Sequence, residues 1–507
     1  MYRIILLTIV FFWFPFLWSQ SINHEKIEKQ LTLADSLFSL NLYNDVIKLL
    51  TPLEATIQTQ GDSNLKSDYY TLLSTSYLFN KDYTECVQTL DKGYVYNLYD
   101  LEDLICAANI SIMELGKYED TKKYARKALI KYFGNQYFED NVSINSIGRL
   151  LYLLGLSYIN NKDPFMATEC QKIHSILNIE EQTDINLDLR EHIKTLNTTT
   201  STQKTNLSNQ LIKIKNLSQS LKTQNLHKFD SIKILEKIES YNTITTENVN
   251  SYLKNVLSLD SIYVLNKDFY SSKHLLDTTI QNINKAHVTL SSYYGIQLMI
   301  RLGQIYSLFK DEDNARYWLF MAKNTCDNIG IHDNTYITLL QLIAGIYTEK
   351  NIFWSRLFIE EAIEIFEDKY GSIFNQNNTE AYVLLTTYAS ILQESRQFNM
   401  AEKIHRYILE YSEDPMAIMF TLNNYGCMLS MTNRNYEAIY YYEQLNGLFP
   451  DASSITNLIN AYINNGFFHN AESTFKQYLY SMFNTIINTY TVFANYEIEK
   501  WWNTYAQ

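Results

Sequence analysis

Residues 298–322, LMIRLGQIYSLFKDEDNARYWLFMA, have the pattern of one complete helical hairpin, and this pattern recurs on both sides of the stretch. Gly303 and Tyr306 are three residues apart, so a helix places them on one face. Ala315 and Ala322 share one face of a second helix. The polar run KDEDN lies between the two helices and allows the chain to turn back. We expect the small residues Gly303, Ala315 and Ala322 to lie where the two helices approach each other closely.

The hairpin resembles the tetratricopeptide repeat (TPR), a pattern with small residues at its eighth, twentieth and twenty-seventh positions and Tyr at its eleventh. Gly303, Tyr306, Ala315 and Ala322 match these positions. The resemblance implies an all-α fold, a right-handed superhelical solenoid of about ten TPR-like helical hairpins. The twentieth-position residues are Val46, Cys86, Thr121, Ala167, Ser272, Ala315, about Arg356, Ala401, Ala438 and Ala471. The hairpin with Arg356 departs from the pattern by one residue and has no small residue at that position.

The same pattern predicts the organisation of the chain. Residues 179–245 interrupt the hairpins, being rich in Asn, Thr, Ser, Lys and Gln. They are interpreted as a diverged helical linker or degenerate repeat, and a disordered hinge remains an alternative. The predicted parts are a signal peptide at 1–19, an N-terminal TPR stack at 20–178, the linker at 179–245, a C-terminal TPR stack at 246–483 and a capping helix at 484–507.

The first residues favour export. Arg3 precedes an apolar run over residues 4–18, which is shorter than the roughly 20 residues that span a bilayer. This is typical of a secretory signal with cleavage near Ser19 or Gln20, and an uncleaved anchor is the alternative. No later apolar run is long enough for a membrane span. The expected location is therefore periplasmic or extracellular.

The composition of the chain limits the classes of partner that are expected. The net charge of −13 argues against nucleic acid and anionic membranes as partners. With 14 Gly and 5 Pro in 507 residues, helix breakers are scarce. The 41 Tyr are interpreted as packing residues. The five Cys form no CxxC pair and are interpreted as buried small residues.

No motif for catalysis is present. The chain contains no GxSxG, P-loop, HExxH, or GxGxxG after a strand, and its nine His are scattered. The sequence therefore predicts no enzyme, no cofactor and no metal site. Residues 497–505, EIEKWWNTY, resemble the junction before the caspase-like CHAT domain of exported bacterial TPR proteins. This second resemblance implies the repeat region of such a protein with the CHAT domain itself absent from the chain.

Polar residues on the first helices of the hairpins are the candidate binding residues. The resemblance implies a groove in which a peptide or partner helix lies, so a protein or peptide partner is expected, and TPR grooves that clamp a carboxylate carry Lys, Arg and Asn on these helices. Asn in successive hairpins would form an amide ladder for an extended backbone, although the Asn-rich composition of the chain is the favoured explanation of their presence. The candidates are Arg301, Gln304, Gln341, Asn423, Asn424, Asn457 and Asn460.

The expected function is that of an exported protein-binding scaffold. One alternative is the regulatory repeat half of a CHAT-type peptidase. Another is a helical outer-membrane glycan-binding protein. Such proteins carry a lipid-anchoring Cys at the mature N-terminus, and no Cys follows Ser19 closely.

Overall fold

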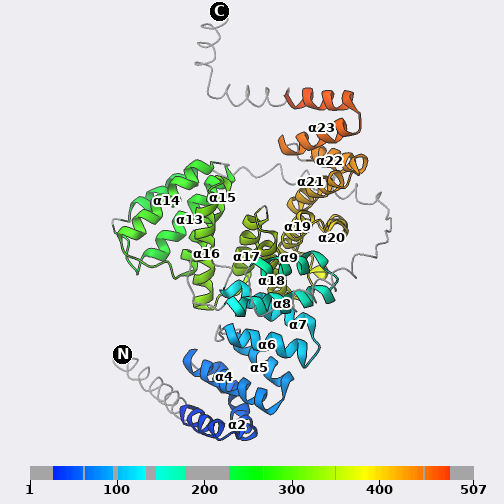
Figure 1. Ribbon diagram of the computed structural model, residues 1–507. Coiled ribbons are helices and arrows are strands. Elements are labelled where there is room, and N and C mark those ends of the chain that lie inside the picture. The colour runs from blue at the N-terminus through cyan, green and yellow to red at the C-terminus, as the bar shows by residue number, and fades with distance from the viewer. Residues whose placement is uncertain are drawn as a thin grey trace, which may run out of the picture. The chain divides into compact units, whose positions relative to one another are not determined.

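The computed structural model describes residues 27–60, 63–94, 101–132, 144–176, 228–241, 243–266, 268–348, 350–448 and 452–479 (Figure 1). Across these ranges the regular structure is helical and contains no strand. The chain forms two compact units. Unit 1 holds the described residues up to 176 together with Lys228–Ile365, and unit 2 holds those from Phe366 onward.

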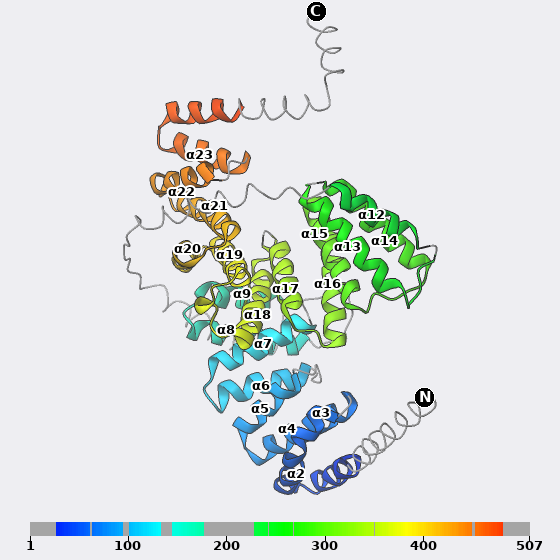
Figure 2. The same cartoon turned by 180° about the vertical axis from the view of Figure 1, so that it is seen from behind.

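Unit 1 begins with helical residues 27–39 and continues through hairpins that stack one after another (Figures 1 and 2). The elements that follow are α2 (Tyr43–Leu50), η1 (Thr51–Leu53), α3 (Glu54–Gln60), α4 (Ser63–Asn80), α5 (Tyr83–Tyr94), α6 (Leu101–Met113), α7 (Tyr118–Tyr132), α8 (Ile144–Asn160) and α9 (Pro164–Ile176). The later elements are α12 (Lys228–Glu239), α13 (Val249–Leu265), α14 (Phe269–Lys285), α15 (Tyr293–Leu308), α16 (Glu312–Ile329), α17 (Asn334–Tyr347) and α18 (Ile352–Tyr370).

Unit 2 repeats the same helix–turn–helix plan. Its elements after α18 are η3 (Ile373–Asn375), α19 (Thr379–Glu394), α20 (Phe398–Tyr411), α21 (Pro415–Met431), α22 (Asn435–Leu448), α23 (Ala452–Asn464) and helical residues 468–479. Apart from α3 and α12, the described α-helices of both units pair into ten successive hairpins. The predicted all-α fold of about ten TPR-like hairpins is confirmed.

One turn geometry recurs through both units. In the turn between α15 and α16, Lys310 has a left-handed backbone conformation with φ of 58°. Its N–H donates to the Ser307 carbonyl at 3.0 Å, and the Asp311 N–H donates to the Tyr306 carbonyl at 3.0 Å. These two bonds form a Schellman motif, which closes the first helix. Equivalent left-handed residues lie two positions before the second helix at Asn41, Lys81, Gly116, Lys162, Arg396, Asn433 and Gly466.

The predicted close approach of small residues is present. A Cβ added to Gly303 would lie 2.5 Å from the Leu319 side chain, and one added to Gly426 would lie 2.5 Å from the Tyr442 ring. Every predicted twentieth-position residue is buried. At the irregular hairpin the small position belongs to Ser355, whose hydroxyl donates to the Ala344 carbonyl at 2.7 Å. The small residue of this hairpin therefore lies at Ser355, one position before the predicted Arg356.

Several predictions concern residues outside the described ranges. The signal peptide at 1–19, most of the linker at 179–245, the capping helix at 484–507 and the CHAT-like junction at 497–505 all fall there. The predicted domain boundaries therefore stay predictions. Among the residues that were searched, no helix is both long and apolar enough to cross a membrane.

Candidate functional site

Four polar side chains form a hydrogen-bonded row across three first helices of unit 2. The Asn424 Nδ2 group donates to Ser390 Oγ at 2.8 Å. Asn423 Nδ2 donates to Asn424 Oδ1 at 3.4 Å, and Asn457 Nδ2 donates to Asn423 Oδ1 at 3.0 Å. We call Ser390, Asn424, Asn423 and Asn457 the amide row. It connects α19, α21 and α23, so it crosses three successive hairpins.

Repeat geometry brings these side chains together. Asn424 and Asn457 occupy the same position in successive hairpins, because each lies nine residues before the left-handed residue of its turn. First helices of neighbouring hairpins pack against each other, as α19 does with α21 and α21 with α23. Gln393 of α19 also donates to the Asn424 backbone carbonyl at 2.7 Å. The row is therefore a consequence of the repeat register.

The amide row keeps unused hydrogen-bonding capacity. Each side-chain amide has two N–H donors and two acceptor lone pairs on its oxygen, and the bonds within the row use only part of these. All four residues of the row are half-buried, so the remaining groups are reached from solvent. Asn460 lies one turn further along α23 and is exposed. Exposed apolar residues stand on the same helices at Val383, Phe420 and Ile463.

The first helices that carry the row hold few charges. The sequences of α21 and α23 contain no charged residue. Charges of unit 2 gather instead around Glu402 of α20, which pairs with Arg406 at 2.7 Å and Arg434 at 2.9 Å. Burial raises the pKa of Glu402, but hydrogen bonds from Arg434 and Arg406 outweigh it and lower the pKa to about 2. The row is therefore a neutral hydrogen-bonding surface.

The remaining predicted binding residues lie in unit 1. Arg301 and Gln304 are on α15, and Gln341 is half-buried on α17. Arg301 Nε pairs with the buried Asp260 carboxylate at 2.7 Å, and its Nη1 donates to Gln304 Oε1 at 3.1 Å. Burial raises the pKa of Asp260, while Ser272 and Arg301 oppose that shift. Arg301 and Gln304 also border a cavity of about 330 Å³.

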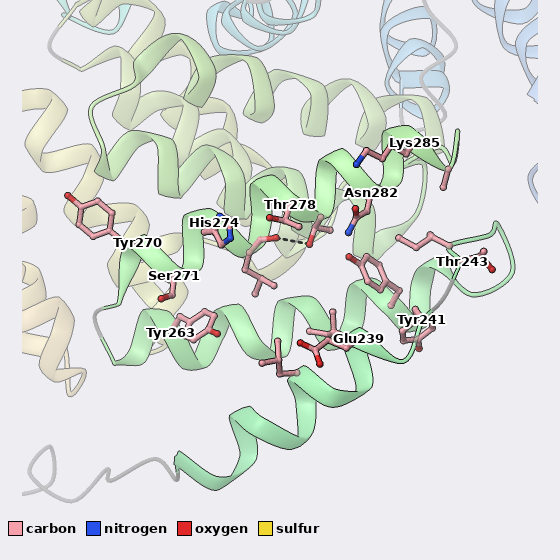
Figure 3. Close-up of a pocket in the computed structure, with 17 residues that line it drawn as sticks. Glu239, Tyr241, Thr243, Tyr263, Tyr270, Ser271, His274, Thr278, Asn282 and Lys285 are labelled. Atoms are coloured by element: carbon pink, nitrogen blue, oxygen red, sulfur yellow. Dashed lines mark hydrogen bonds between the residues drawn. The ribbon is translucent and has the colours of Figure 1, made fainter.

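A larger groove in unit 1 lies between α12, α13 and α14 (Figure 3). Its cavity volume is about 940 Å³, and four tyrosines contribute to its lining: Tyr241, Tyr252, Tyr263 and Tyr270. We call it the tyrosine groove. Figure 3 shows its titratable residues Glu239, His274 and Lys285 spread along the groove and not gathered at one point. The groove therefore offers aromatic faces and hydroxyl groups, without a cluster of acid and base.

Sequence reasoning missed the tyrosine groove, because the tyrosines were interpreted as packing residues. Tyr270 is 79% exposed, whereas Tyr252 is buried. A signal was present: Tyr241, Tyr252 and Tyr263 follow one another at intervals of eleven residues. Three helical turns take about 10.8 residues, so Tyr252 and Tyr263 share one face of α13.

Several cysteines and histidines in the described part of the chain lie packed in the protein interior. All five cysteines are free, and Cys86, Cys170 and Cys326 are buried. Burial raises the pKa of Cys86 and of Cys326 to about 12, which disfavours the reactive thiolate. His405 is fully buried, and burial lowers its pKa to about 3. Within the searched ranges, no group of three or more metal-ligating side chains occurs.

Comparisons with known proteins add little to this description. No family model matches the chain, and no curated protein sequence matches it. Among solved structures it is similar to a chain of the APC/C hetero-tetramer Cut9–Hcn1, with 11% identity, a TM-score of 0.35, and coverage of 87% of this chain and 84% of that chain. It is also similar to yeast Tom70, with 13% identity, a TM-score of 0.30, and coverage of 90% and 96%. At these TM-scores neither similarity carries an argument, and the fold assignment rests on the hairpin contacts described above.

Proposed function

We propose that this chain is a protein-interaction scaffold in which the amide row of unit 2 binds an extended peptide segment of a partner protein. The observation that supports this is the continuous row of half-buried polar side chains across α19, α21 and α23, three amides and the Ser390 hydroxyl, with donors and acceptors left over. An extended backbone presents alternating C=O and N–H groups, and a side-chain amide complements both. Binding is reversible and neither makes nor breaks a covalent bond.

The expected energetics are those of a modest peptide groove. Each net hydrogen bond contributes about 0.5–1.5 kcal/mol, so the row alone gives weak binding. Burial of the exposed side chains Val383, Phe420 and Ile463 adds to this, at roughly 25 cal/mol per Å² of apolar surface. The low charge of α21 and α23 favours a partner segment without strong charge.

The test is affinity capture with the full chain as bait. Proteins captured from a native extract are identified, and a peptide derived from the strongest candidate is titrated by fluorescence anisotropy. The variant Asn423→Ala/Asn424→Ala/Asn457→Ala is expected to bind this peptide at least tenfold more weakly, because it lacks the whole side-chain ladder. The matched control is Asn399→Ala, an exposed amide on the second helix α20. Equal affinity of the triple variant and the wild type would rule out the amide row as the binding surface.

Two finer parts of the proposal rest on the sequence. Export is supported by the apolar run over residues 4–18 that follows Arg3, and N-terminal sequencing of the protein from fractionated cells tests it. A start at residue 20 or 21 in an exported fraction is expected, whereas an intact Met1 favours the anchored alternative. The relation to CHAT-type peptidases rests on residues 497–505 and is tested by a search for a caspase-like reading frame next to this one.

A further inference from the structure

A buried set of charges joins two runs of hairpins in unit 1 that are far apart in the sequence. Helix α7 provides Lys122, Lys123, Arg126 and Lys127. Helix α18 provides Arg356, Glu360, Glu361 and Glu364. Tyr158 of α8 and Asp163, which lies just before α9, complete the set. We call these ten residues the charge seam.

The contacts in the charge seam are direct. Arg126 Nε lies 3.0 Å from Glu361 Oε2, and the same guanidinium also pairs with Glu364. Glu360 Oε2 accepts a hydrogen bond from the Tyr158 hydroxyl at 2.9 Å and lies 3.1 Å from Lys122 Nζ. These pairs link residues that are 202–238 positions apart in the chain.

Arg356 forms the second part of the seam. Its Nη2 lies 2.7 Å from Asp163 Oδ2 and 2.7 Å from Glu360 Oε1. Asp163 also accepts a hydrogen bond from the Met166 backbone N–H at 3.1 Å, at the start of α9. The side chain of Arg356, which follows the small residue Ser355 of this hairpin, therefore contacts the turn between α8 and α9.

The charges at the centre of the seam are removed from water, whereas Lys122, Lys123 and Glu364 at its edge are half-buried. Arg126, Arg356 and Glu361 are at most 3% exposed. Burial alone raises the pKa of Glu360, but Lys122, Arg356 and Arg126 outweigh it, so the pKa lies well below its ordinary value. Five cationic side chains face four carboxylates of the seam and Asp91, which pairs with Lys123 at 3.3 Å. The seam is therefore electrically balanced only when its two sides meet.

The position of the seam is unusual for a hairpin array, in which each repeat contacts its neighbours. Because both faces carry charges, each face is compatible with water when the two are apart, unlike the two halves of an apolar core. Buried ion pairs are also costly to desolvate, so they hold an interface together less firmly than apolar packing of equal area. Both properties are those of an interface between parts that separate.

We propose that the charge seam is a separable intramolecular interface, which docks α18 on α7–α9 and opens and closes while the hairpins away from the seam stay folded. Charge matching selects the closed arrangement, because any other pairing leaves a cation or a carboxylate buried without a partner. The closed state therefore depends on the complete set of charges, whereas the hairpins depend on their own apolar contacts.

Hydrogen exchange of the full chain, measured by mass spectrometry at pH 7, tests this proposal. In Arg126→Met, Glu361 and Glu364 lose their guanidinium partner. Because α7 and α18 lose their packing partner when the seam opens and their helical turns then open more readily, their amides are expected to exchange about a hundredfold faster than in the wild type. The hairpins α4–α5 and α15–α16 are expected to keep their protection. The matched control is Lys172→Met, which removes the exposed pair with Glu169 and should leave exchange unchanged.

A second variant separates the effect of charge from that of lost packing. In Arg126→Met/Glu361→Met the carboxylate that pairs with Arg126 Nε is replaced as well, and apolar side chains occupy the same space, while Glu364 keeps its pair with Lys127 at 3.4 Å. Protection of α7 and α18 is expected to return to within about tenfold of the wild type, since well-packed apolar groups replace buried ion pairs at little cost. Three results would each overturn the proposal: unchanged exchange in Arg126→Met, faster exchange throughout unit 1, or no recovery in the double variant.

Discussion

The charge seam of unit 1 and the amide row of unit 2 are both lines of polar side chains that connect helices, but their surroundings differ. Arg126 and Glu361 in the seam are almost fully buried and carry opposite charges. Asn423 and Asn424 in the row are neutral, half-buried and only partly hydrogen-bonded. A buried and matched set of charges specifies one arrangement, and removal of one member is costly. A half-buried set with spare donors and acceptors tolerates removal and remains open to a ligand.

The largest effect is expected from Arg356→Met in the charge seam. The substitution leaves Asp163 and Glu360 buried without their guanidinium partner, so the closed seam should lose about 3–5 kcal/mol relative to the open one. Hydrogen exchange of the α7 and α18 amides measures this loss. The control Lys350→Met removes an exposed pair with Glu312 and should cost less than about 1 kcal/mol. Similar losses of stability for the two variants would mean that the buried ion pairs of the seam contribute no more than an exposed ion pair.

A smaller effect with a defined pH window is expected at His405. The ring stacks on Tyr425 with centroids 5.4 Å apart, and burial lowers the His405 pKa from 6.5 to about 3. The unfolded chain therefore binds a proton below pH 6.5 that folded unit 2 does not accept until about pH 3. Stability of unit 2 is unaffected above pH 6.5 and declines as the pH falls, by roughly 2 kcal/mol at pH 5.

Thermal unfolding at pH 7 and pH 5 tests this for the wild type and His405→Leu. The variant should lose less stability between the two pH values. The charge seam should be indifferent over this range, because the pKa of Glu360 lies well below 4.5 and its contribution is lost only in stronger acid. An equal decline in both proteins would show that another group titrates.

The smallest effect is expected from Asn424→Ala in the amide row. Ser390 and Asn423 lose a hydrogen-bond partner, but both are half-buried and water can replace it. The loss of stability should be about 1 kcal/mol, measured as a shift in the unfolding midpoint of unit 2. Asn399→Ala is the control and should leave the midpoint unchanged. A loss as large as that of Arg356→Met would remove the distinction between the two regions.

Contacts within one hairpin could be predicted from the sequence, whereas contacts between helices far apart in the chain could not. The contact of Gly303 with Leu319 follows from spacing along two adjacent helices, so residues 298–322 were sufficient to predict it. The pairing of Arg356 with Asp163 joins residues 193 positions apart, and periodicity carries no information about such a contact. Asn423 and Asn457 are an intermediate case. Repeat register predicts that they are neighbours, but it does not predict that they bond to each other.

The charge seam also has a mechanical consequence. Arg126 and Glu361 close a loop in which the two residues are 235 positions apart. A force that pulls on the first hairpin of unit 1 and on α18 passes directly through the seam, so the hairpins inside the loop carry no load while it holds. Rupture would place the folded hairpins inside the loop under load, and their complete unfolding would then release chain with a contour length of roughly 800 Å, at about 3.4 Å per residue when fully extended. The seam would thus break at a threshold force and only then allow the enclosed chain to extend, whereas a hairpin array without such a contact extends gradually under load.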